Sequence, residues 1–344
     1  MKAYIQKVSE KQNLTRNEAA AAMRTIMDGQ ATEAQIAGFL MALKLKGEHP
    51  DELLGFAEVM REKSVKVNID DPDAIDMCGT GGDGSGTFNI STVASFVVAG
   101  AGVTVAKHGN RAMSSSCGSA DVLKALGVNL EIPPEKVEAC INKIGIGFLF
   151  APLFHPAMKY AAKPRSELGV KTCFNLLGPM TNPAGVRRQL VGTFSQDAAE
   201  KMAQVFTRLN AVKVLLVHSE DGLDEVSLAA STTVFDVNSQ LFNGKYNVEP
   251  KAFGLSAVTK DSIRGGSAET NASIAMKVLQ GEKGPSPTDG WRAHRDVVLV
   301  NAAFGLLVAG KVRTVQEGVS MAVESIDSGK ALKKLNDLRA FTTQ

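Results

Sequence analysis

Residues 74–92 read AIDMCGTGGDGSGTFNIST, and this stretch decides which kind of fold the chain adopts. The apolar segment AIDMC (74–78) has the length and composition of a short strand. Five of the eight residues from Gly79 to Gly86 are glycine. Ordering glycines costs backbone entropy, so a loop this rich in glycine is expected to use their small size or conformational freedom for a purpose. A helix is expected from about Ser91 to Ala99. Strand, glycine-rich loop and helix in this order predict an α/β domain.

Strand-like and helix-like segments keep alternating toward the C-terminus. The strand-like segments are VTVAK (103–107), QLVGTF (189–194) and KVLLVH (213–218), and the helix-like segments are ADVLKALG (120–127) and AAEKMAQVFTRL (198–209). Residues 231–250 indicate a more irregular β excursion, and helices are expected near 267–280 and 292–309. This order predicts a large α/β domain over residues 74–344 with a central, mostly parallel sheet. We expect the apolar segment 296–310 to be core.

Residues 1–70 show helical patterns and no strand-like segment. Thr15 with Glu18, and Thr32 with Gln35, match the capping box that begins a helix. Apolar residues follow at helical spacing at Ile36, Phe39, Leu40 and Leu43 and, after Pro50, at Leu53, Leu54, Ala57 and Met60. We predict a small helical domain over residues 1–70, joined by helices near 134–175. VKVNIDDPD (65–73) is the expected linker.

Composition limits the class of protein. The chain has 344 residues and a formal net charge of +2, so bulk charge gives no case for binding nucleic acid or membranes. The four cysteines lack CxxC spacing, which is typical of reduced thiols and not of a disulfide framework or a zinc site. No signal pattern opens the sequence, and polar residues interrupt every long apolar stretch. We expect a soluble, cytoplasmic protein.

The glycine-rich loop fits a phosphate better than a dinucleotide. GTGGDG (79–84) matches GxGxxG, but a dinucleotide site also needs an acidic residue about 20 positions later. No Asp or Glu occurs between Asp83 and Asp121, and no GK[ST] completes a Walker A motif. Glycines let backbone amides approach an anion, and the helix start at 89–92 adds amides and hydroxyls. Taken alone, a tight turn with an ordinary helix cap explains the loop equally well.

A second anion-seeking loop favours the phosphate interpretation. KHGNRAMSSSCGSAD (107–121) carries Lys, His and Arg within five residues, followed by serines. It follows the strand that comes directly after the first loop's helix. Because parallel strands end at the same edge of a sheet, the two loops are expected to face one crevice. The alternative is that the basic residues are solvated charges and the serines form a polar turn. Two such loops, one strand apart, make this alternative the weaker explanation.

The third stretch, SEDGLDEV (219–226), has the opposite charge. Four acids within six residues beside a phosphate would repel it unless a cation intervenes. Oxygen ligands without nearby cysteine predict a hard cation, most simply Mg²⁺. A solvated acidic loop is the alternative, and the sequence alone does not show that the loops meet.

A fourth stretch, FLFAPLFHPAMKYAAKPRSELG (148–169), runs into KTCFNLLGPMTNPAG (171–185). Arg165 follows a proline near an expected helix end, where it could grip a carboxylate with two hydrogen bonds or simply be solvated. Ala151-Pro152 and His155-Pro156 are expected to be turn and entry elements.

Together these stretches resemble the anthranilate phosphoribosyltransferase family of tryptophan biosynthesis. The matching motifs are GTGGD (79–83), NIST (89–92), KHGNR (107–111), SSSCGSAD (114–121), NLLGPMTNP (175–183) and the acidic pair 224–225. The likeness covers nearly the whole chain, with departures at Leu153, Met158 and Ser166. It implies a homodimer in which a small helical and a large α/β domain close over a cleft. It places the dimer surface in N-terminal helices such as Ile36 to Leu43.

The resemblance implies transfer of the 5-phosphoribosyl group from phosphoribosyl pyrophosphate (PRPP) to the amine of anthranilate, the second step from chorismate to tryptophan. By matching position, the residues that would hold PRPP are Gly79, Gly82, Asp83, Thr87, Asn89, Ile90, Ser91, Thr92, Lys107, His108, Gly109, Asn110, Arg111, Ala112, Met113, Ser114, Ser115 and Ser119. Those that would contact anthranilate are Gly79, His108, Asn110, Ala151, Pro152, His155, Arg165 and Gly178. Ser91, Asp224 and Glu225 would serve Mg²⁺, expected as two ions.

The chemistry implied needs no single general base. The arylamine of anthranilate is neutral at pH 7, so Lys107, Asn110 and Arg165 would position substrates instead. Charge that builds on the leaving pyrophosphate would be neutralised by Mg²⁺ and backbone amides. The resemblance implies an oxocarbenium-like transition state with inversion at C1.

Three other classes remain to be weighed. A pyrimidine nucleoside phosphorylase has a similar architecture but needs one phosphate and no metal bridge, so the acidic turn and NLLGPMTNP disfavour it. A nucleic-acid-binding paralogue should show a basic stripe with exposed aromatics, and aromatics are only 6% of residues. A type I phosphoribosyltransferase signature is not reproduced at 213–225.

Overall fold

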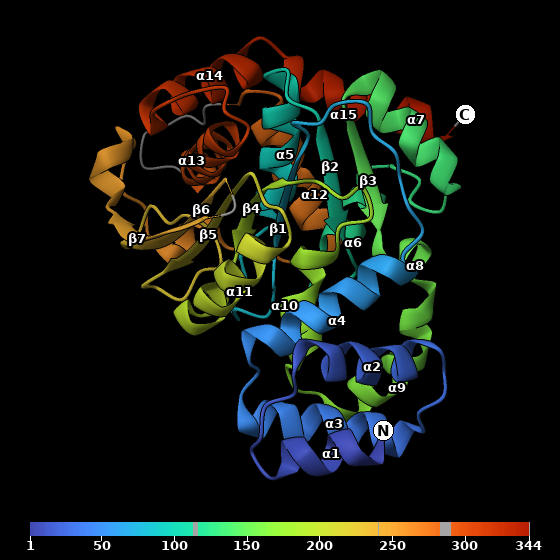
Figure 1. Ribbon diagram of the computed structural model, residues 1–344. Coiled ribbons are helices and arrows are strands. Elements are labelled where there is room, and N and C mark those ends of the chain that lie inside the picture. The colour runs from blue at the N-terminus through green and yellow to red at the C-terminus, as the bar shows by residue number, and fades with distance from the viewer. Residues whose placement is uncertain (113–115, 240, 283–289, 344) are drawn as a thin grey trace.

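The computed structural model describes residues 1–112, 116–239, 241–282 and 290–343, which form two lobes (Figure 1). An N-terminal helical bundle makes the lower lobe in that view. A sheet covered by helices makes the upper lobe.

The central sheet has the strand order β3-β2-β1-β4-β5-β6-β7. Its strands are β1 (Ile75–Gly79), β2 (Val105–Gly109), β3 (Ile146–Phe150), β4 (Arg188–Gly192), β5 (Lys213–Ser219), β6 (Thr232–Asn238) and β7 (Leu241–Val248). All pairs from β3 to β5 are parallel, and β6 and β7 extend the sheet in antiparallel fashion. The predicted mostly parallel sheet is confirmed. The sequence analysis missed β3, because a short, wholly apolar run does not distinguish a strand from a helix.

Helices cover both faces of this sheet. The helices that follow β1 in the chain are α5 (Ile90–Gly100), α6 (Ser119–Ala125), α7 (Pro134–Ile144), α8 (Ala151–Phe154), α9 (Lys159–Leu168), α10 (Cys173–Leu177), α11 (Gln196–Arg208), α12 (Ala268–Leu279), α13 (Gly290–Val308), α14 (Val315–Asp327) and α15 (Lys330–Thr343), of which α9 and α10 do not lie on the sheet. The alternation of side chains along β5 divides the core. Leu215 and Val217 pack with α5 and α13 on one face, whereas Val214 and Leu216 pack with α11 on the other. The expected core helix within α13 is confirmed, since Val297 to Val300 are at most 2% exposed.

The N-terminal bundle consists of α1 (Lys2–Ser9), α2 (Arg16–Met27), α3 (Glu33–Lys46) and α4 (Pro50–Lys63). Both predicted capping boxes form, at Thr15 before α2 and at Thr32 before α3, and Pro50 occupies the first turn of α4. Helices α9 and α10 pack against this bundle, whereas α7 packs against β3 and α15. The bundle and the α11 face of the sheet share one continuous apolar core.

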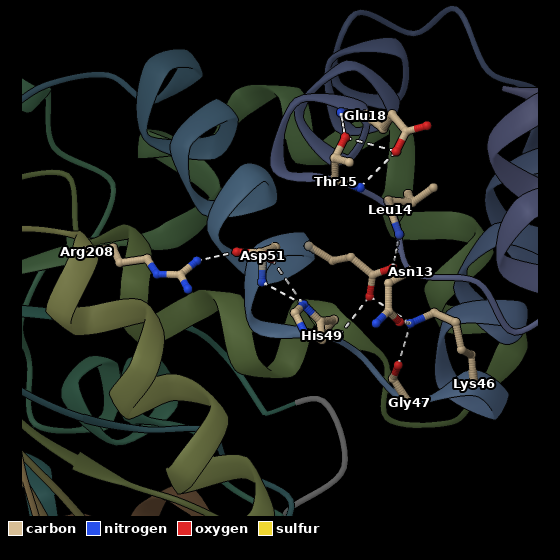
Figure 2. A network of polar contacts seen from close by, with 10 residues as sticks. Asn13, Leu14, Thr15, Glu18, Lys46, Gly47, His49, Asp51 and Arg208 are labelled. Carbon is tan, nitrogen blue, oxygen red and sulfur yellow. Dashed lines mark hydrogen bonds and ion pairs between the residues drawn. The ribbon is translucent and has the colours of Figure 1, made fainter.

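A buried ion pair holds the turn between α3 and α4 (Figure 2). Glu52, which is 0% exposed, accepts hydrogen bonds from Lys46 Nζ (2.9 Å), the Leu14 amide (2.9 Å) and the His49 amide (2.8 Å). Desolvating a carboxylate is costly unless its oxygens are satisfied in this way. From the same turn, Asp51 forms an ion pair with Arg208 of α11 and so links the two lobes.

The apolar stripe of α3 is not available to a partner. Ile36, Phe39, Leu40 and Leu43 are at most 1% exposed within this chain. A dimer surface on this helix would therefore have to use its other faces, because α1, α4 and α9 already cover the face that carries these four side chains. Over the described ranges, no helix is long and apolar enough to cross a membrane.

Candidate active site

The glycine-rich loop leaves the sheet at its topological switch point. From β1 the chain continues to β2 and β3 on one side and returns to β4 on the other side of β1. Gly79 at the end of β1 pairs with Gly192 at the end of β4. In open α/β sheets, the crevice at the carboxyl ends of the strands at such a point binds ligands. The loop therefore lies at the ligand-binding edge.

The loop is anchored at both ends and open in between. The Thr80 amide donates to the Gly192 carbonyl, and the Gly265 amide donates to the Gly86 carbonyl, both at 2.9 Å. Gly81 has a φ of +64°, a region that residues with a Cβ rarely adopt. No atom lies within 4 Å of the place where its Cβ would be. The middle of the loop therefore borders open space, where backbone amides can approach a ligand.

The acidic turn after β5 meets this loop. The backbone oxygen of Asp224 approaches Gly192 so closely that a Cβ there would lie 1.6 Å from it. The Asp224 carboxylate lies 3.0 Å from the Cβ position of Gly79. The Asp224 amide donates to the Asp83 carboxylate of the glycine-rich loop at 3.4 Å. Two glycines at the ends of adjacent strands thus make room for the turn.

The turn concentrates negative charge at this edge of the sheet. Limited hydration raises the pKa of Asp224, and the nearby Asp83 carboxylate raises it further. Limited hydration and the Asp224 carboxylate likewise raise the pKa of Glu225. The other two acids do not contribute, because Asp221 is bonded within the turn to Ser227 and Glu220 is exposed. A cation is the natural partner for the remaining carboxylates.

The donor atoms at this site fit a hard divalent cation. Carboxylate and hydroxyl oxygens are the ligands that Mg²⁺ prefers. Among the described residues, no group of three His, Cys, Asp or Glu side chains could hold a metal ion by itself. The chain supplies only part of a coordination shell, which suits an ion that arrives with a phosphate-bearing substrate. Asp224, Glu225 and the Ser91 hydroxyl are the residues that would hold it.

The first turn of α5 is partly occupied by the protein itself. The Ser91 amide, expected to be free for an anion, donates to the Glu225 carboxylate at 3.1 Å. Ile90 and Thr92 are each 1% exposed, so both residues are buried at this helix start. The expectation of free amides along this turn is therefore wrong for Ser91, because a protein carboxylate takes the place of the anion.

Lys107 and His108 lie in the second half of β2 and are buried. The Lys107 ammonium donates to the Met77 carbonyl and, at 3.4 Å, to the Ser91 hydroxyl. Burial lowers the pKa of Lys107, and nearby carboxylates oppose that shift. The His108 amide donates to Asp76 at 3.1 Å. Lys107 thus connects β1 to the first turn of α5 instead of projecting into solvent.

Asp76 is a site residue that the sequence analysis missed. It is 0% exposed, and burial raises the pKa of its carboxyl group. Besides the His108 amide it accepts from Asn182 Nδ2 (2.8 Å) and Gln189 Nε2 (3.4 Å). Asn182 belongs to NLLGPMTNP, so Asp76 ties that segment to β2. A carboxylate within an otherwise apolar strand was the signal.

His108 faces His155 across the end of the sheet. The ring centroids are 5.2 Å apart, and each Nε2 is buried without a hydrogen-bond partner. Burial lowers the pKa of His108 to about 3 and that of His155 to about 4. Both imidazoles are therefore neutral near pH 7, and the pair makes an uncharged wall.

Arg165 forms no ion pair with any residue that the structure describes. Its guanidinium lies over the Phe174 ring at 4.9 Å from the centroid, and burial lowers its pKa. No carboxylate of the described residues lies within ion-pairing distance of it. Gly178 borders open space, since no atom lies within 4 Å of its Cβ position. Ala151 and Pro152 begin the short helix α8 and so are not the plain turn we expected.

The remaining predicted residues follow β1 or β2. Gly82, Asp83 and Thr87 lie in the glycine-rich loop, and Gly109, Asn110, Arg111, Ala112 and Ser119 lie between the end of β2 and the start of α6. Arg111 lies 3.6 Å from Glu131 and stacks over Phe150. Met113, Ser114 and Ser115 lie outside the described residues.

Comparison with known proteins places both lobes in one kind of enzyme. Residues 2–64 match the helical bundle domain of a glycosyl transferase family, and residues 71–332 match the a/b domain of that family. The chain is 51% identical over 342 residues to an anthranilate phosphoribosyltransferase from Symbiobacterium thermophilum, covering 99% of this chain and 98% of the relative.

Two solved structures share the fold over the full length. The anthranilate phosphoribosyltransferase of Thermus thermophilus is 42% identical with a TM-score of 0.91 and 99% of each chain covered. The enzyme from Saccharomyces cerevisiae in complex with PRPP and Mg is 28% identical with a TM-score of 0.90, covering 99% of this chain and 97% of that one.

Proposed function

The chain belongs to the anthranilate phosphoribosyltransferase family, and from that membership we propose its reaction and the role of each residue. The protein transfers the 5-phosphoribosyl group of PRPP to the amine of anthranilate, which gives N-(5-phosphoribosyl)anthranilate and pyrophosphate in tryptophan biosynthesis. One observation carries the proposal. The acidic turn at Asp224 is packed against Gly79 and Gly192, at the edge where the glycine-rich loop opens.

The donor would lie over the glycine-rich loop and the end of β2. Amides of the loop from Gly79 to Thr87 would bind its phosphates, because that loop borders open space at its centre. Lys107 would supply charge from below, and the segment from Asn110 to Ser119 would close the other side. These contacts hold C1 of the ribose in place for attack.

Asp224, Glu225 and Ser91 would hold Mg²⁺, and we propose two ions because the two carboxylates have different neighbours. Asp224 lies beside Asp83, whereas Glu225 lies at the Ser91 amide. When bound, Mg²⁺ neutralises charge on the pyrophosphate as it leaves. The carboxylates hold the cation at the switch point, and the loop amides add fixed dipoles there.

The acceptor would enter between the two lobes. Arg165 would bind the carboxylate of anthranilate, since its guanidinium is half-buried and pairs with no carboxylate of the described residues. The neutral His108 and His155, with Gly178, Ala151 and Pro152, would line its path, and Asn110 would orient the amine. No general base is required, because an arylamine already presents its lone pair.

We propose the domain division, the assembly and the location of the protein from the packing of its helices and the state of its cysteines. The helical domain would comprise residues 1–70, and of the helices expected near 134–175 α9 and α10 would join it, since they pack against the bundle. A homodimer would form through the exposed parts of the N-terminal helices, where Leu45 at the end of α3 is 78% exposed. No disulfide joins the four cysteines, which suits the cytoplasm.

The test is loss of anthranilate fluorescence on addition of PRPP, with Mg²⁺ present and then chelated. Mg²⁺-dependent loss with an equal release of pyrophosphate is the expected result. A folded protein that binds PRPP but leaves anthranilate unchanged would refute the acceptor. Phosphate-dependent cleavage of a pyrimidine nucleoside in its place would identify a phosphorylase.

A further inference from the structure

A single buried amide interrupts the apolar helix α13. Asn301 is 0% exposed. Its Oδ1 accepts from the Val226 amide at 3.0 Å, and its Nδ2 donates to the Val226 carbonyl at 3.0 Å and to the Val297 carbonyl at 2.8 Å. Asn301 therefore pairs with both backbone groups of the residue that follows Glu225.

Ser219 at the end of β5 holds the same turn from the other side. It is 0% exposed, and its hydroxyl donates to the Glu225 carbonyl at 2.8 Å. Because a serine hydroxyl has one hydrogen, the 2.6 Å contact with Thr232 must be donated by Thr232. Thr232 in turn accepts from the Ser227 amide at 3.1 Å. The hydroxyls of Ser219 and Thr232 each donate one hydrogen bond and accept one.

The peptide unit between Glu225 and Val226 is thus held at both of its polar groups. Its carbonyl is bonded to Ser219, and its amide is bonded to Asn301. No neighbouring strand among the described residues forms hydrogen bonds with this peptide unit, so the side chains of Ser219 and Asn301 form them instead. A buried asparagine is expensive in an apolar helix unless it is fully paired. Here its bonds to another element all go to the acidic turn.

We propose that Asn301 and Ser219 are positioning residues that hold the acidic turn in the geometry needed to bind the metal and diphosphate. This inference rests on the metal role of Asp224 and Glu225 proposed above. Neither residue touches the reacting groups. They act by fixing the backbone on which the two carboxylates are carried, so that the carboxylates need not be ordered when the donor arrives.

The test compares Asn301→Ala and Ser219→Ala with Ser325→Ala. Ser325 is 2% exposed in α14 and donates to the Val97 carbonyl at 2.7 Å, so its loss removes a buried hydrogen bond of the same core without touching the turn. The first readout is amide hydrogen exchange of residues 222–227 in the free enzyme. The second is the Mg²⁺ concentration that gives half-maximal activity, measured beside KM for PRPP and kcat.

We expect exchange of the turn to quicken about tenfold in Asn301→Ala and Ser219→Ala, because one to two hydrogen bonds are lost. The Mg²⁺ requirement should rise by a similar factor. Ser325→Ala should lower the melting temperature and change neither readout. If the two turn variants only lose stability, as Ser325→Ala does, the inference is overturned. Should Asn301→Ala not fold, Ser219→Ala alone decides, since it removes one oxygen at the end of a strand.

Asp224→Asn and Glu225→Gln separate the two levels of the argument. If both leave the Mg²⁺ requirement unchanged, the proposed metal role fails and the inference falls with it. If both raise it while Asn301→Ala and Ser219→Ala do not, the metal role stands and only the positioning role is refuted.

Discussion

Replacing Gly192 by alanine should disable the enzyme without unfolding it. A Cβ at this position would lie 1.6 Å from the Asp224 backbone oxygen, whereas ordinary contacts begin at 3.4 Å. The oxygen must therefore retreat by about 1.8 Å, and the Asp224 carboxylate moves with it. A misplacement of about 1 Å in a positioned group can lower the rate about 10²-fold. We expect kcat/KM for PRPP to fall at least that far.

Stability has to be separated from activity in this experiment. Overpacking of this kind destabilises a protein by about 1–3 kcal/mol. Gly147→Ala in β3 is the matched control, because its Cβ would meet the Ile141 side chain at 2.4 Å, far from the acidic turn. Steady-state kinetics over a Mg²⁺ series, with urea unfolding of each variant, gives both quantities. The reasoning is refuted if folded Gly192→Ala keeps native kcat/KM and an unchanged Mg²⁺ requirement.

The other predictions concern charge. Arg165→Ala should raise KM for anthranilate about tenfold or more and barely change the PRPP dissociation constant, because a charge-assisted contact to the anthranilate carboxylate is lost. If titration and kinetics show that the affinities for both substrates fall equally, Arg165 does not belong to the acceptor site. Asp224→Asn should raise the Mg²⁺ concentration for half-maximal activity, and a native value would argue against its metal role. The free energy of unfolding should fall as pH drops below about 6.5, by up to about 1.4 kcal/mol per pH unit for each buried histidine. The reason is that the pKa values of His108 and His155 are lowered in the folded protein, so the unfolded chain takes up protons first. His155→Gln should make that slope shallower in urea unfolding from pH 7 to 5, and an unchanged slope would contradict the lowered pKa.

The sequence predicts the fold well where a local signal agrees with the final environment. The capping boxes at Thr15 and Thr32 satisfy backbone amides within a few residues, so no distant contact can overrule them. The parallel strands are visible because each is a short apolar run between a loop and a helix. Strand β3 was missed because an apolar run buried on both faces has no period to detect.

The candidate site could be predicted only by the type of residue it uses. The cluster of acids indicates a metal, and the glycine-rich loop indicates a phosphate. Whether the acidic turn meets that loop depends on β4 lying between β1 and β5. Asp76 and Asn301 escaped for another reason. Each is one polar residue in an apolar segment, and its role depends on partners distant in the chain, such as Asn182 for Asp76 and Val226 for Asn301.

The charge balance at the switch point follows from one contact. The Ser91 amide cannot donate fully to both Glu225 and a phosphate oxygen. PRPP and the Glu225 carboxylate would therefore compete for this amide in the first turn of α5. A bare diphosphate would also meet the Asp224 carboxylate, which is already crowded by Asp83. A divalent cation would reverse both effects, because it would attract the carboxylates and the diphosphate and leave the Ser91 amide to the ligand. Glu225, which accepts from the Ser91 amide, is thus also the carboxylate that would bind the proposed cation.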